Sequence, residues 1–100
     1  MTSLKTKIMD NFKLGMDVNI TGLVHKSVIN VPYHILENIF GQPTIVENNN
    51  YAIWKLKFED TDETIAILND TSNYLETNRW FVKSGNLNGI ERVKNILSSI

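Results

Sequence analysis

The stretch Tyr51–Phe58, YAIWKLKF, decides the fold because apolar and polar side chains alternate along it. Successive side chains of an extended strand point to opposite faces, so one face receives Ala52, Trp54, Leu56 and Phe58. The opposite face receives Tyr51, Ile53, Lys55 and Lys57. This pattern predicts a strand that buries one face in a hydrophobic core, with Trp54 inside that core.

Further strands are expected on both sides of this one. Residues 59–63 form an acidic turn, and residues 64–68 return as the second strand of a hairpin. Residues 79–83 are a third strand, on which Trp80 faces the opposite way from Phe81 and Lys83. Upstream, residues 16–21 alternate like a half-buried strand, and the β-branched side chains of residues 23–31 favour another.

Two helices are expected before the hairpin. Residues 3–13 carry apolar side chains at helical spacing. In residues 32–40, Pro32 suits the first helical turn, and the apolar side chains again share one helical face. Gly41 is suited to a left-handed cap that would end this helix.

A last helix, about residues 88–98, is expected to begin at Asn88, with Glu91 three residues later as in a capping box. The helices bracket the strands and do not alternate with them, which disfavours a doubly wound parallel sheet. The sequence therefore predicts the α+β class. We expect a twisted antiparallel sheet of four or five strands, with helices at about residues 3–13, 32–40 and 88–98 packed mainly on one face.

Composition limits the organisation and the partners of the chain. Its 100 residues are expected to form a single domain, residues 1–100, around one core. The formal net charge of -1 argues against duplex nucleic acid as a partner, since proteins that bind it are usually strongly basic. No apolar run approaches the roughly 20 residues of a membrane-spanning helix. The absence of cysteine excludes disulfides and thiolate catalysis and favours a cytoplasmic location.

The sequence shows no pattern for catalysis or metal binding. His25 and His34 form no recognisable ligand or acid–base motif, so a hydrolase that uses either is the least favoured interpretation. A calcium loop that begins at Asp60, within the acidic residues 59–63, is not expected, because Ile65 occupies its sixth position, where glycine is needed. Neither a G-x-S-x-G elbow nor a glycine-rich phosphate loop occurs. We therefore expect no catalytic residue, no metal and no cofactor.

Basic residues suggest a surface that binds anions. Lys55 and Lys57 share one strand face, and Arg79 and Lys83 lie in the third strand, with aromatic residues between them. Surfaces of this kind bind nucleotides or single-stranded nucleic acid through charge and stacking. The alternative is that these residues only keep the protein soluble and its sheet edges apart.

The turn before the last helix is a second candidate for anion binding. Ser84, Gly85 and Asn86 are small or polar, and a helix N-terminus attracts a phosphate through its free backbone amides. The alternative is an ordinary strand–turn–helix connection. The candidate ligand site comprises Lys55, Lys57, Arg79, Lys83, Ser84, Gly85 and Asn86.

Four short motifs follow one another along the chain: FGQP at residues 40–43, WKLKFED at 54–60, TI at 64–65 and WFVKSG at 80–85. Their order resembles the pattern F-G-x-P … W-x-L-x-F-x-D … T-I … W-x-[IV]-x-x-G of small, mostly uncharacterised proteins of phages and large DNA viruses. The resemblance covers roughly residues 24–98 and rests on Phe40, Gly41, Pro43, Trp54, Phe58, Asp60, Thr64, Ile65, Trp80 and Gly85.

The resemblance implies a virus-encoded accessory protein of the host cytoplasm and not an enzyme. Small viral proteins of this kind often block or sequester a host defence component by stoichiometric binding. The expected partner is therefore a host defence protein or a small nucleotide messenger. The alternative function is a single-stranded nucleic-acid or replication-associated binding protein. A homodimer is compatible with either function, because a sheet of this size leaves edges that a second copy can cover.

Overall fold

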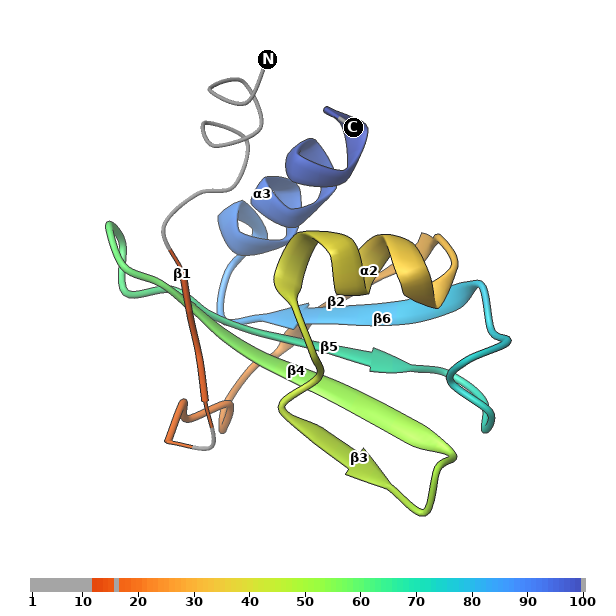
Figure 1. The fold of residues 1–100 in the computed structure, drawn as a ribbon. Coiled ribbons are helices and arrows are strands. Elements are labelled where there is room, and N and C mark those ends of the chain that lie inside the picture. The colour runs from red at the N-terminus through yellow and green to blue at the C-terminus, as the bar shows by residue number, and fades with distance from the viewer. Residues whose placement is uncertain (1–11, 16, 100) are drawn as a thin grey trace.

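A computed structural model of the chain describes residues 12–15 and 17–99 (Figure 1). Within them the α+β class is confirmed, with strands and helices in the order β1 (Phe12–Leu14), β2 (His25–Asn30), α2 (Tyr33–Phe40), β3 (Ile45–Glu47), β4 (Tyr51–Phe58), β5 (Thr64–Asn69), β6 (Arg79–Ser84) and α3 (Leu87–Ser98). Five of the strands form an antiparallel sheet in the order β1-β4-β5-β6-β2. The short β3, which the sequence did not predict, pairs with β4 on the same edge as β1.

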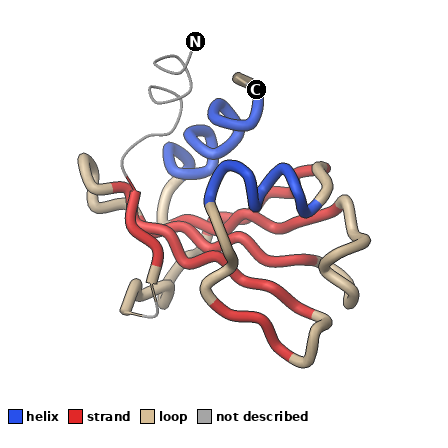
Figure 2. The backbone as a smooth tube through the Cα atoms, in the orientation of Figure 1, coloured by secondary structure: helices blue, strands red, loops and turns tan. Residues whose placement is uncertain are grey.

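Both helices cover one face of the sheet (Figure 2). The cross-strand register places Trp54 opposite Ile67, and Ile67 opposite Val82, so that the apolar residues of three strands share this helix-covered face. All three side chains have no exposed surface. Alternation along the strands therefore determined which face is buried, as the sequence predicts.

The two tryptophans hold the ends of α2. The indole N–H of Trp80 donates to the carbonyl of Val31 at 2.9 Å, just before the helix. The indole N–H of Trp54 donates to the carbonyl of Gly41 at 2.9 Å, just after it. Gly41 ends the helix, as the sequence predicts, but not in the left-handed helical conformation that was expected: its φ is 84° and its ψ is -162°, an extended conformation open mainly to glycine.

Tyr33, in the first turn of α2, packs against both indole rings, with centroid distances of 5.8 Å to Trp54 and 6.4 Å to Trp80. Its hydroxyl donates to Glu37 at 3.2 Å. Partial burial and the charge of Glu37 raise the pKa of Tyr33 to about 12. The helix is thus fixed to the sheet by ring packing as well as by its two terminal hydrogen bonds.

The N-terminal predictions are wrong where the structure tests them. Residues 12 and 13 of the predicted helix 3–13 belong to β1, because the edge of β4 offers them backbone partners, with Phe12 opposite Phe58; residues 3–11 lie outside the described residues. The predicted strand 16–21 is irregular over residues 17–21. There the amide of Val18 bonds to the carbonyl of Gly15 at 3.1 Å, so local turns replace strand pairing.

The last helix begins earlier than predicted. Asn86, and not Asn88, is its N-cap: the Asn86 side chain accepts a hydrogen bond from the amide of Gly89 at 3.0 Å. Glu91 is therefore too far along the helix to complete a capping box. The helix 32–40 is confirmed as Tyr33–Phe40.

Candidate functional site

The face of the sheet opposite the helices, which we call the lysine face, carries the basic residues Lys26, Lys55, Lys57, Arg79 and Lys83. Three of them lie in one row across the strands. Lys55 is opposite Ala66, Ala66 is opposite Lys83, and Lys83 is opposite Lys26. Adjacent strands are about 4.8 Å apart, so Lys55 and Lys83 flank Ala66 with backbones roughly 10 Å from each other.

The cations of this face differ in their partners. Lys57 is paired with Asp62 at 3.4 Å, and Arg79 with Asp70 at 2.5 Å. The ammonium of Lys26 lies 4.5 Å from the centre of the Phe81 ring, a cation–π contact. Among the residues that the structure describes, Lys55 and Lys83 form no ion pair with a carboxylate.

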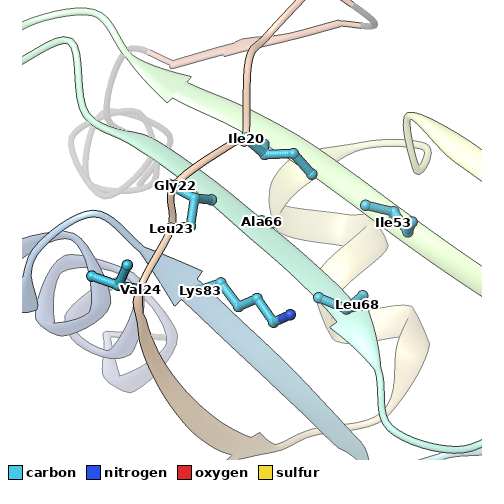
Figure 3. Close-up of a pocket in the computed structure, with 8 residues that line it drawn as sticks. All are labelled: Ile20, Gly22, Leu23, Val24, Ile53, Ala66, Leu68 and Lys83. Carbon is cyan, nitrogen blue, oxygen red and sulfur yellow. The ribbon is translucent and has the colours of Figure 1, made fainter.

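The lysine face is partly covered by the connection between β1 and β2. These strands lie at opposite ends of the sheet, so the chain must cross one face to join them. Residues 17–24, which we call the crossing segment, run across the lysine face (Figure 3). Between them and the sheet is an open pocket of about 230 Å³, lined by Ile20, Gly22, Leu23, Val24, Ile53, Ala66, Leu68 and Lys83.

The predicted site residues fall into separate groups. Lys55, Lys57, Arg79 and Lys83 share the lysine face, as predicted, but Lys57 and Arg79 already have acidic partners. Ser84 belongs to the helix-covered face, where its side chain is buried beside Gly89. The structure therefore does not bring the turn residues into contact with the lysine row.

The turn before α3 is not suited to an anion. Gly85 and Asn86 line a hollow together with Asp62 and Glu63 from the β4–β5 turn. Two carboxylates at this position would repel a phosphate. The side chain of Asn86 is also occupied in capping α3. We therefore leave Ser84, Gly85 and Asn86 out of the site developed below.

Sequence reasoning missed several residues of the site. Lys26 joins the row only because β2 pairs with β6, a pairing between distant parts of the chain. Ile20 and Leu23 were assigned to strands, whereas both lie in the crossing segment and line the pocket. The signal for Ala66 was in the sequence, since it is a small residue between two bulky strand neighbours. The two histidines stay apart from the pocket lining, with His25 in β2 and His34 in α2.

The motif residues behind the viral resemblance mainly support the fold. Trp54 and Gly41 share the hydrogen bond that ends α2. The carboxylate of Asp60 binds Arg92 of α3 through two hydrogen bonds, of 2.7 and 2.9 Å. These bonds lower the pKa of Asp60, and Arg92 also lies over the Phe58 ring, with 4.0 Å between guanidinium carbon and ring centre. The motif thus links the hairpin to both helices.

In the part of the chain that the structure describes, no three or more potential metal-binding side chains form a group. No helix in that part has the length and apolar character needed to span a bilayer. Compared with known proteins, the chain matches no family model, no curated protein and no solved structure.

Proposed function

We propose that this protein is a non-enzymatic binding protein whose lysine face holds a small phosphate-bearing anion of the nucleotide class. Lys55 and Lys83 would contact the anion directly, and Lys26 would add to the positive potential beside them. Stoichiometric capture needs charge and shape complementarity but no reacting group. The protein would then act by withholding the ligand from other proteins.

The observation that carries this proposal is the row Lys55–Ala66–Lys83–Lys26. Like charges placed opposite each other on a sheet destabilise it, and Lys83 and Lys26 are opposite each other. Protection of a sheet edge explains Lys26, since β2 is an edge strand. It does not explain Lys55 and Lys83, because β4 and β6 have neighbours on both sides. An anion that bridges the ammonium groups would offset this repulsion.

The pocket beside the row favours binding over catalysis. Its lining consists of aliphatic side chains, one glycine and the ammonium of Lys83. Acid–base and nucleophilic catalysis use a histidine, a carboxylate, a hydroxyl or a thiol close to the reacting atoms. In place of such catalytic groups, the lining provides an apolar surface that can bury a ligand and one positive charge. These are the elements of a site that retains a ligand unchanged.

The resemblance to small viral proteins suggests what the ligand would be used for. We propose a host nucleotide messenger as the ligand and evasion of host defence as the outcome. A ligand that is sequestered and not converted should be recovered intact when the protein is denatured. If instead a host defence protein is the partner, the isolated chain would bind no nucleotide.

Single-stranded nucleic acid is the second candidate, because aromatic residues accompany the lysines. Tyr51 is 41% exposed and shares the lysine face with Phe81. Exposed aromatic rings stack on bases. For a single strand that also contacts the three lysines of the row, the logarithm of the binding constant would fall with the logarithm of the salt concentration, with a slope of about −2. A mononucleotide-sized ligand would show a smaller slope, and its affinity would not rise with oligonucleotide length.

The test is calorimetric titration of the full chain with pyrophosphate. We expect one pyrophosphate per chain, and at least a tenfold loss of affinity in Lys55→Gln and in Lys83→Gln, because a hydrogen bond to a charged group contributes about 1.5–3 kcal/mol. Lys94→Gln is the matched control, since Lys94 lies on α3 and lines a different hollow. Equal losses in all three variants, or no binding to the wild-type chain, would overturn the proposal.

A further inference from the structure

The pocket beside the crossing segment is lined by aliphatic side chains of this segment and of the sheet. Ile20 and Leu23 of the crossing segment lie on one side of Ala66, and Ile53 and Leu68 of the sheet lie on the other (Figure 3). The side chain of Lys83 extends along the sheet, and it is the single charged group of the lining. A ligand in this space would therefore meet aliphatic side chains from both the crossing segment and the sheet, with one ammonium beside it.

Ala66 gives the pocket its depth. It lies between Lys55 and Lys83 in the cross-strand row, and its side chain is 2% exposed at the floor of the pocket. A larger side chain at this position would extend into the space beneath the crossing segment. The small residue thus leaves an apolar depression directly between two ammonium-bearing side chains.

The volume limits the size of the ligand. An apolar cavity of about 150 Å³ accepts benzene, whereas pockets for drug-sized ligands measure about 300–1,000 Å³. At about 230 Å³ the pocket has room for one ring system but not for two nucleotides. A dinucleotide could place only one of its bases inside.

We propose that the pocket takes the ring of a mononucleotide, with the phosphate held at the mouth of the pocket by the ammonium groups of Lys83 and Lys55. This inference rests on the proposed function and specifies its ligand: an anion with one flat apolar group, and not an inorganic polyphosphate. The aliphatic side chains of the crossing segment and of the sheet would contact the base. Because the lining has no hydrogen-bonding side chain other than Lys83, discrimination among bases would depend on this lysine and on backbone groups of the lining.

The test compares three probes by calorimetry on the full chain: adenosine 5′-monophosphate, adenosine and pyrophosphate. We expect the monophosphate to bind at least tenfold more tightly than either adenosine or pyrophosphate, since it alone uses both the pocket and the lysines. Ala66→Leu should lower the affinity for the monophosphate at least tenfold and change that for pyrophosphate less than twofold. Val46→Leu adds a methylene on exposed β3 and serves as the control.

A measurement on the wild-type chain covers the case in which Ala66→Leu does not fold. On addition of adenosine 5′-monophosphate, the methyl resonances of Ile20, Leu23 and Leu68 should shift, while those of Val93, a buried residue of α3 on the other side of the sheet, should not. The outcomes separate the two proposals. If pyrophosphate binds as tightly as the monophosphate and these methyl groups do not shift, the pocket is not a base site, but the lysine row still binds anions. If none of the phosphate probes binds, the proposed function itself is wrong.

Discussion

At the scale of single residues, the two tryptophans decide where α2 lies. Each has no exposed surface, and each donates its indole N–H to a backbone carbonyl at one end of the helix. Their rings also touch each other edge to face, with 5.4 Å between centroids. Burial alone would tolerate many orientations of a helix on a sheet. The two directional hydrogen bonds select one of them, because each fixes a helix end over a particular strand.

We expect Trp54→Phe and Trp80→Phe each to lower the free energy of unfolding by about 1–2 kcal/mol, because phenylalanine keeps much of the apolar burial but removes the donor. Truncation to alanine should cost about 3–5 kcal/mol, since it also leaves a cavity. Urea denaturation monitored by circular dichroism measures both. Tyr51→Phe, which alters an exposed ring on the other face, should change the stability by less than about 0.5 kcal/mol. A similar loss in all three phenylalanine variants would contradict this account.

At the scale of an element, α3 shows how a cap and a close contact together fix a helix start. The side chain of Asn86 satisfies the amide of Gly89. A Cβ added at Gly89 would lie 2.5 Å from Cδ1 of Ile65 and also collide with the hydroxyl of Ser84. Any larger residue there would force the buried side chains of Ile65 and Ser84 to move, because the first turn of the helix lies directly on β5 and β6. The start of α3 is thus set by packing against the sheet as well as by its cap.

Asn86→Ala should lower the free energy of unfolding by about 1 kcal/mol, because it leaves an amide at the start of α3 without its acceptor. Asn88→Ala is the matched control: Asn88 is exposed inside the first turn, and alanine is the better helix former. It should leave the stability unchanged or raise it slightly. Chemical denaturation of the two variants in parallel measures the difference. The reverse order of stabilities would identify Asn88 as the true cap.

At the scale of the whole molecule, the path of the chain makes the two faces of the sheet different and leaves one edge of the sheet unpaired. The helices cover one face, and the crossing segment covers part of the other (Figures 1 and 3). Among the described residues, β2 pairs with β6 alone, which leaves its second edge without a strand. Beside that edge is a hollow of about 390 Å³ whose lining includes Val31 and Leu97. Unpaired edge strands readily pair with another chain.

The homodimer expected from the sequence stays a prediction, and this edge is where it would form. Sedimentation velocity over a range of protein concentrations should show reversible dimerisation. Leu97→Gln, beside β2, should weaken the dimer at least tenfold by removing apolar surface from its interface. Leu87→Gln is the matched control, because Leu87 is 63% exposed at the other end of α3. A monomer at every concentration would contradict the prediction, without bearing on the lysine face.

The local pattern of the sequence was sufficient for the hairpin, for the strand at residues 79–83 and for the helix at residues 32–40. In each of these elements, the spacing of the apolar residues along the chain indicates directly which side chains are buried. Near the N-terminus, the spacing of the apolar residues was misleading. Phe12 fits a helical spacing as well as a strand, and its pairing with Phe58 became decisive only once β4 was in place.

The sequence by itself determined that Lys55 and Lys83 are on the face opposite Trp54 and Trp80, because alternation in a strand is a local property. Only the tertiary structure decided that the two lysines flank Ala66, that Lys26 joins their row, and that the crossing segment borders a pocket beside them. The physical reason is that the pairing of distant strands sets these contacts. The neighbours of a residue in the sequence indicate whether that residue is buried, but they do not indicate which strand lies beside it.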